Sequence, residues 1–229
     1  GKVTYVATHG GSVAAYDAGG KELWNVPVLL EAGALAVSPK GDRVAVGGYP
    51  GLLVLDAADG KVLDGFRAAP KSAGNWILIN RITSVAWNSA GTRVAGGWVN
   101  NKWGGGPGPD PHDVVVLDAN GKPLPSPKVD GNVFGVAFVP GTDTLLIGAD
   151  KLTAANSADG SVLWANEIGG AQSFAFSSDG QTAAAGGWGK NAGVFKLADG
   201  VIAESAKMDA VIGGVALTPT NDLIVAVWG

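Results

Sequence analysis

A short turn ending in glycine recurs along the chain, and this repeat restricts the possible folds more than any other feature. The turns end at Gly20, Gly60, Gly121, Gly160 and Gly200, at intervals of 40, 61, 39 and 40 residues. Each turn lies between two short apolar runs, as in VLDAADGKVL. Short apolar runs joined by tight turns predict antiparallel strands. A period of about forty residues predicts a repeat architecture in which each copy is one supersecondary unit.

A second landmark confirms the period within the sequence itself. Five further runs, among them SVAWNS and SFAFSS, share an alanine at the third position, namely Ala36, Ala86, Ala137, Ala175 and Ala216. Each copy then reads as four strands, with the alanine in the first strand, where innermost strands would crowd a central axis. This pattern predicts an all-β fold, a five-bladed β-propeller of four-stranded antiparallel blades forming a single domain over residues 1–229.

The two chain ends carry the same kind of strand. The interval from Gly200 through the ends to Gly20 is 49 residues, and both VTYVATHG (3–10) and LIVAVW (223–228) align with the second strand of a copy. We expect the ring to close by pairing N- and C-terminal strands in one shared blade, because closure removes an open sheet edge. Residues 12–16 and 21–24 would be its third and fourth strands. A ring of six positions with one incomplete is the alternative.

Composition narrows the classes of partner. The net charge is −4 and the sixteen Lys and Arg are scattered, which argues against nucleic acid. No apolar run reaches the roughly 18 residues of a membrane span, so no membrane is expected. The chain has no cysteine, which excludes disulfides and thiolate metal sites. We expect a soluble monomer or a component of a larger complex. The compartment stays open, with the periplasm or secretion favoured.

The repeat units resemble two known families. SVAWNSAGTRVAGG and SFAFSSDGQTAAAGG resemble bacterial WD repeats, while AYDAGGKELW, VLDAADGKVL and NSADGSVLW resemble the repeats of quinoprotein-like propellers. Resemblance to quinone-dependent dehydrogenases would imply a tryptophan-rich floor, a calcium ion, a catalytic Asp and often a vicinal disulfide. The disulfide is impossible here, and five blades are fewer than that family's eight. Only the repeat architecture is carried over.

The extra residues of the long interval define a candidate binding face. They fall between 66 and 81 and between 99 and 113, in connections that leave the second or fourth strand of a copy. Those connections share one face of a propeller, and the short, uniform turns share the other. Variable loops on a rigid scaffold usually carry recognition. We therefore expect the ligand on the face with the insertions.

Aromatic residues gather on that face. The candidate ligand-binding residues, at the ends of second strands and in the insertions, are Tyr49, Trp76, Trp98, Asn100, Trp103, Trp188 and Trp228. Indoles at equivalent places would suit a protein, a peptide, a glycan or a flat cofactor. Trp98 and Trp188 can also be read as packing between blades, because aromatics fixed to a repeat are often architectural. Trp103 lies outside the repeat, which favours binding.

Catalytic and metal sites find little support. Asp110, His112 and Asp113 are weak candidates for a divalent ion, since their spacing matches no established motif. Ten of the twenty acids occupy repeated turns, where Asp caps its own backbone. The runs expected to line the channel carry no acid, which argues against a glycosidase. Because the chain has no Cys and only two His, it has almost no residues from which a Ser/His/Asp or Cys/His catalytic triad could be built.

These observations predict a non-catalytic binding or scaffold module without a cofactor, which recognises a protein, peptide or glycan on the face with the insertions. The alternative is an enzyme of the quinoprotein type, or another enzyme, with its cofactor or substrate at the tryptophan-rich end of the channel.

Overall fold

The computed structural model describes residues 2–29, 31–67, 80–100 and 114–228. These segments contain strands and no helix, and thus no helix that could cross a membrane. Six antiparallel sheets follow one another along the chain. Sheet A holds β1 (Val3–Ala7), β2 (Ser12–Asp17) and β3 (Glu22–Pro27), and sheet B holds β4 (Glu31–Val37), β5 (Arg43–Tyr49), β6 (Gly51–Asp56) and β7 (Val62–Arg67). Sheet C holds β8 (Asn80–Trp87), β9 (Arg93–Asn100) and β10 (Val114–Asp118).

The C-terminal half continues the same pattern. Sheet D holds β11 (Gly135–Phe138), β12 (Thr144–Gly148), β13 (Leu152–Asn156) and β14 (Val162–Asn166). Sheet E holds β15 (Ala171–Phe176), β16 (Thr182–Gly187), β17 (Asn191–Lys196) and β18 (Ile202–Lys207), and sheet F holds β19 (Ile212–Leu217) and β20 (Leu223–Val227). Strands pair in chain order within every sheet. The expected four-stranded meander is therefore confirmed for sheets B, D and E.

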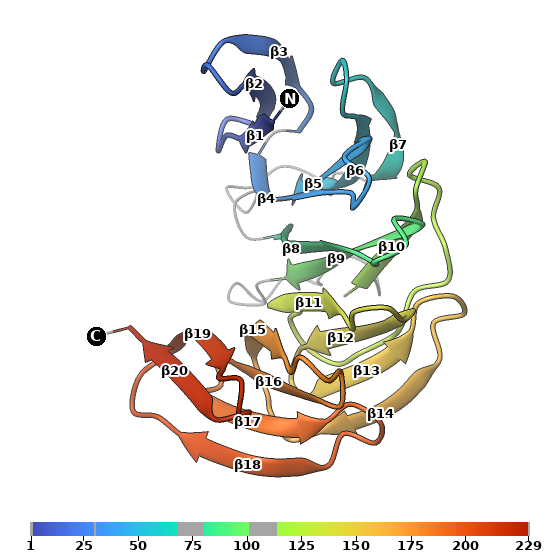
Figure 1. Ribbon diagram of the computed structural model, residues 1–229. Coiled ribbons are helices and arrows are strands. Elements are labelled where there is room, and N and C mark those ends of the chain that lie inside the picture. Colours follow the sequence, from blue (N-terminus) through green and yellow to red (C-terminus); the bar gives the residue numbers. More distant parts are fainter. Residues whose placement is uncertain (1, 30, 68–79, 101–113, 229) are drawn as a thin grey trace.

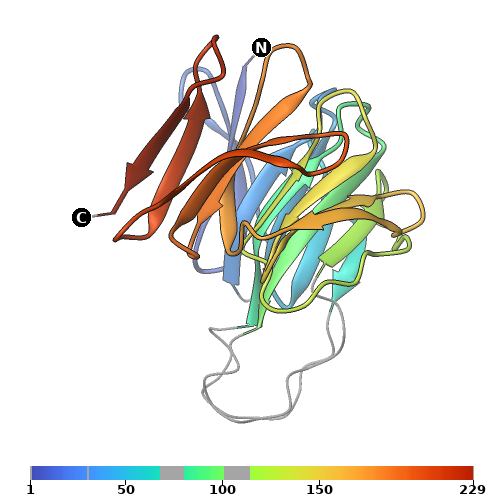
Figure 2. The same cartoon turned by 90° about the horizontal axis from the view of Figure 1, so that it is seen from below.

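The sheets stand side by side in an arc, with their first strands on the concave side (Figure 1). Those inner strands are β4, β8, β11, β15 and β19. Ala36, near the end of β4, pairs with Ala45, and Ala86 in β8 pairs with Ala95. The repeated alanines thus lie where neighbouring sheets converge. Seen from below, the strands run between two rims (Figure 2).

Apolar side chains fill the space between successive sheets. Between sheets B and C, Leu52 and Val54 meet Ile82, Val94 and Leu117, all at 0% exposure. Between sheets D and E, Leu146 and Ile168 meet Ala183 and Phe195. Middle strands such as β5 and β6 are buried over most of their length, which explains their nearly continuous apolar runs.

Two tryptophans in fourth strands, one in sheet A and one in sheet D, fasten their sheets to a turn of the next sheet. The indole N–H of Trp24 in β3 donates to the carbonyl of Ala57 (3.1 Å), and that of Trp164 in β14 donates to the carbonyl of Leu197 (3.0 Å). The turn glycines Gly60 and Gly200 have φ of +74° and +73° and lie against these indoles. Glycine is required at these turns for two reasons. The positive φ would strain a residue with a side chain, and a Cβ would clash with the indole ring.

The ends of the chain do not form the shared blade that the sequence predicted. β1 pairs with β2, β20 pairs with β19, and sheets A and F lie at opposite ends of the arc (Figure 1). Both β1 and β20 occupy the position of a second strand, as predicted. A shared blade has room for one second strand, so one of the two would have to leave this position for the ring to close. Sheet A accordingly has three strands and sheet F two among the described residues.

Sheet C also departs from the four-stranded expectation. After β10, the chain makes one isolated bridge, between Leu117 and Pro123. The sequence KPLPSPK (122–128) follows where a fourth strand would lie. Its three prolines lack the N–H that a continuous ladder requires. The Oγ of Ser126 accepts a hydrogen bond from the N–H of Val116 instead, at 3.0 Å.

Candidate functional site

One rim of the arc, here called the insertion rim, is where second strands end and first strands begin. Arg67, Asn80, Asn100 and Val114, the described residues that flank the two insertions, are all strand ends on this rim. The attachment points of both insertions therefore share one rim, as predicted. Trp76, Trp103, Asp110, His112 and Asp113 lie outside the described residues.

Trp188 and Trp228 come together on the insertion rim. Trp188 follows β16 and Trp228 follows β20, and their ring centroids are 6.0 Å apart with planes at 70°. Phe134, which directly precedes β11, lies 6.1 Å from Trp188 with planes at 30°. Sheets D, E and F thus each contribute one ring to a cluster, here called the rim aromatic cluster. Its two indoles remain 48% and 59% exposed.

The hydrogen bonds of the indoles separate these two tryptophans from the structural ones. Trp24, Trp87 and Trp164 each donate their N–H to a main-chain carbonyl of a neighbouring sheet. Within the described part of the chain, the N–H groups of Trp188 and Trp228 have no acceptor. An exposed ring with an unused donor can offer both contact area and a hydrogen bond to a ligand.

Trp98 is buried and belongs to the core, although the sequence aligned it with Trp188. Ser84 pairs with Gly97 in sheet C and Ser173 with Gly186 in sheet E, so Trp98 corresponds to Gly187 and not to Trp188. A shift of one residue sends a side chain to the opposite face of a strand. Trp98 is 5% exposed and packs edge-to-face against Phe66, with centroids 6.3 Å apart.

The other predicted residues lie apart from the cluster. Tyr49 ends β5, is half-buried and pairs with Glu31 of β4. Asn100 ends β9 opposite Asn80, and only its backbone is described. At the position of Trp188, sheet D has Asp150 and sheet A has His9. The expected ring of indoles is therefore limited to sheets E and F in the described residues.

Residues at the start of the inner strands were missed by sequence reasoning. In β4, β8, β15 and β19, the pairing register shifts at Gly33, Thr83, Gln172 and Gly213. A β-bulge leaves its extra residue out of the ladder and can redirect its side chain. Phe134 occupies the corresponding step before β11. A sequence signal existed, because each of these residues stands three positions before the repeated alanine, but the direction of a bulged side chain depends on the bulge.

An ion pair on a buried carboxylate links sheets B and C on the same rim, and a histidine of sheet A approaches this carboxylate. Glu31 of β4 is 3% exposed, and its carboxylate pairs with the guanidinium of Arg81 in β8. The Nδ1 of His9, in the β1–β2 turn, lies 3.4 Å from Oε1 of Glu31. The second carboxylate oxygen, Oε2, has no partner among the residues that the structure describes. One inner strand, β4, thus begins with an acid, which lies just before the run predicted to line the channel.

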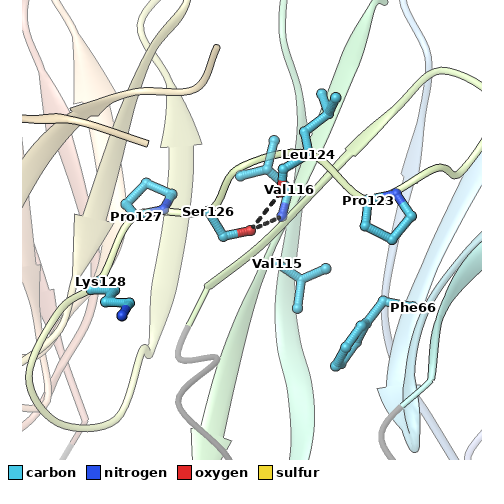
Figure 3. A pocket seen from close by; sticks show the side chains of 8 residues that line it. All are labelled: Phe66, Val115, Val116, Pro123, Leu124, Ser126, Pro127 and Lys128. Carbon is cyan, nitrogen blue, oxygen red and sulfur yellow. Dashed lines mark hydrogen bonds between the residues drawn. The ribbon is translucent and has the colours of Figure 1, made fainter. Parts of the chain in front are cut away.

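A pocket of about 320 Å³ lies on the outer side of sheet C, beside the proline-rich segment (Figure 3). It is lined by Phe66, Val115, Val116, Pro123, Leu124, Ser126, Pro127 and Lys128. The Ser126 hydroxyl already bonds to Val116 N–H and to the carbonyl of Leu124, as the dashed lines show. The pocket offers apolar walls without converging free polar groups, which ligand sites usually have.

No group of three or more His, Cys, Asp or Glu able to hold a metal occurs in the described residues.

The comparisons with known proteins concern the N-terminal part of the chain. Residues 9–78 match the PQQ_2 family, whose description is outer membrane protein assembly factor BamB. The matched range includes β2 to β7, which covers the first tryptophan-to-turn contact between Trp24 and Ala57. The match supports quinoprotein-like repeats of the propeller type. No curated protein matches the chain.

Proposed function

We propose that this protein is a non-catalytic binding module, and that the rim aromatic cluster recognises a protein partner. The observation that carries the proposal is the pair of exposed indoles, Trp188 and Trp228. Their N–H groups have no acceptor among the described residues, while those of Trp24 and Trp164 donate to main-chain carbonyls. Burying such rings provides large contact area at low entropic cost.

The similarity to a family described as an assembly factor supports a protein as the partner, within a larger complex. The rim position is also favourable, because strand ends on a packed scaffold hold their side chains in fixed places. The arc of sheets thus provides rigidity, and the exposed side chains provide recognition.

The test is affinity capture from an extract of the source organism, with the native protein compared with Trp188→Ala and Trp228→Ala. We expect each substitution to abolish capture of a defined partner while the melting temperature stays unchanged. The matched control is Leu163→Ala, since Leu163 is a 54% exposed apolar residue away from the insertion rim. Equal capture by native protein and both tryptophan variants would contradict the proposal.

An enzyme of the quinoprotein type makes a different prediction. Such a protein would carry a bound chromophore, so the absorption spectrum of the purified protein above 300 nm distinguishes the two functions. We expect no band there, and a stoichiometric quinone or calcium ion would overturn the binding-module proposal.

A further inference from the structure

Asn120 lies at the tip of the turn that follows β10, and it is the one asparagine of the sequence that precedes a glycine. It is exposed, and its side-chain amide has no partner among the described residues. The amide of Asn166, by contrast, donates to the carbonyl of Gly200 at 3.0 Å and accepts from the N–H of Ile168. Because Gly121 has no Cβ, little obstructs the approach of its backbone nitrogen to the carbonyl carbon of the Asn120 amide. Asn120 therefore has surroundings that favour deamidation.

One aspartate holds this turn closed. The Oδ1 of Asp118 accepts from the N–H of Asn120 at 2.8 Å, and its carbonyl accepts from the N–H of Gly121 at 3.0 Å. Sheet A makes the same turn with Gly19 in the place of Asn120, since the N–H of Gly19 donates to Oδ1 of Asp17 at 2.8 Å. The turn thus does not need the asparagine side chain. It does hold the nitrogen of Gly121 in a hydrogen bond, which has to open before this nitrogen can attack.

Gly121 also packs tightly against the neighbouring sheet. It is buried, its φ is +92°, and a Cβ there would lie 2.5 Å from the carbonyl carbon of Asp64 in β7. The turn glycine Gly60 lies in the same way against Trp24 of sheet A. This contact leaves no room for additional backbone atoms. A longer backbone between residues 120 and 121 would therefore disturb the packing of sheet C on sheet B.

We propose that Asn120 is a site of spontaneous deamidation, that the turn of Asp118 limits its rate, and that the isoaspartate product loosens the contact between sheets B and C. The nitrogen of Gly121 attacks Cγ of Asn120, the bond from Cγ to Nδ2 breaks, and the amide leaves as ammonia with the proton from the attacking nitrogen. Water then opens the cyclic imide at one of its two carbonyls. One product is aspartate, with the backbone unchanged. The other is isoaspartate, in which the backbone runs through Cβ and Cγ and is longer by a methylene group. The reaction needs water alone, and it is independent of the proposed function.

The test incubates the protein at pH 8.5 and 37 °C and samples it over several weeks. Peptide mapping by mass spectrometry measures the deamidated share of each asparagine, and an isoaspartyl methyltransferase labels the isoaspartate form. Asn120→Gly is the matched control without an amide, because Gly19 shows that glycine fits this position. Asn120→Asp carries the new charge on a normal backbone, and Asp59 and Asp159 already precede turn glycines elsewhere in the chain. Asp118→Ala removes the side-chain acceptor that holds the turn.

We expect Asn120 to be deamidated faster than every other asparagine, and about fivefold faster again in Asp118→Ala, the value of one hydrogen bond. The isoaspartate form should melt about 3 °C below the native protein, because Gly121 loses its hydrogen bond. Asn120→Asp should melt with the native protein, and Asn120→Gly should gain no label in this turn.

Faster deamidation of Asn156 or of any other asparagine would overturn the assignment of the site. An unchanged rate in Asp118→Ala would overturn the role of the turn. Equal melting temperatures of the isoaspartate form and Asn120→Asp would overturn the effect on the two sheets.

Discussion

The guanidinium of Arg81 at the start of β8 pairs with the carboxylate of Glu31, which is 3% exposed at the start of β4. The pair links sheets B and C at the insertion rim, and His9 of sheet A approaches the same carboxylate. Removing one member of a buried pair leaves the other charge uncompensated, and this costs far more than the pair itself contributes.

Arg81→Met should therefore lower the free energy of unfolding by about 3 kcal/mol, measured by urea denaturation. Adding Glu31→Leu to this variant should restore most of the loss. Lys151→Met is the control, since the Lys151–Glu167 pair is exposed and its loss should have no measurable effect. Equal stability of the single and double variants would show that the buried charge is not the cause.

Trp164→Phe should lower the free energy of unfolding by about 1 kcal/mol, because the carbonyl of Leu197 loses its donor while most of the ring packing stays. The same change at Trp188 should leave stability unaltered, since its N–H has no acceptor in the described residues. Thermal and urea unfolding of both variants measure the difference. A larger loss for Trp188→Phe would mean that its role is structural.

Gly200→Ala should be more destabilising than Gly180→Ala, although both glycines have positive φ, +73° and +68°. Nothing lies within 4 Å of a Cβ at Gly180, so only backbone strain of about 1 kcal/mol is expected there. A Cβ at Gly200 would lie 2.4 Å from Cε3 of Trp164 and must displace the indole. Urea midpoints of the two variants compare the two costs, and equal midpoints would argue against a tight turn-to-tryptophan contact.

Stability should fall in acid through the turn aspartates. The hydroxyl of Ser177 donates to Asp179, and that of Ser161 to Asp159, so the pKa of each carboxyl lies below its ordinary value of 3.8. A lowered pKa in the folded state contributes stability that is complete above 3.8 and is lost as pH falls through the folded value. Melting temperatures measured from pH 6 to pH 2 should therefore drop below pH 4. The drop should be smaller in Ser177→Ala, and a larger drop would reverse the sign.

The strand order was predictable because turn chemistry is local. Asp17, Asp56 and Asp118 accept from backbone N–H groups within four residues, as the turn positions of Asp predicted. Strands at 12–16 and 21–24, and the two second strands at the chain ends, are likewise confirmed. These features depend on neighbours in sequence, so the sequence alone suffices.

Features that depend on distant partners escaped prediction. The burial of Trp98 follows from a register offset of one residue, and the pattern Gly-Gly-Trp gives no sign of it. The separation of sheets A and F depends on which of two similar strands pairs with β2. Of the predicted site residues, Trp188 and Trp228 meet in the structure. Gln172 was overlooked because it is the bulged residue of β15, and Phe134 because it precedes β11 and belongs to no repeated motif.

The register shift at the start of the inner strands has a consequence for how such a protein can diversify. The bulged residue does not take part in strand pairing, so pairing does not restrict which residue stands there. The residues at this position differ between the sheets: Gly33, Thr83, Gln172 and Gly213. Substitutions at this step change the surface of the rim while the hydrogen-bonded scaffold stays the same. One repeating backbone irregularity thereby lets the rim surface vary separately from the strand ladder.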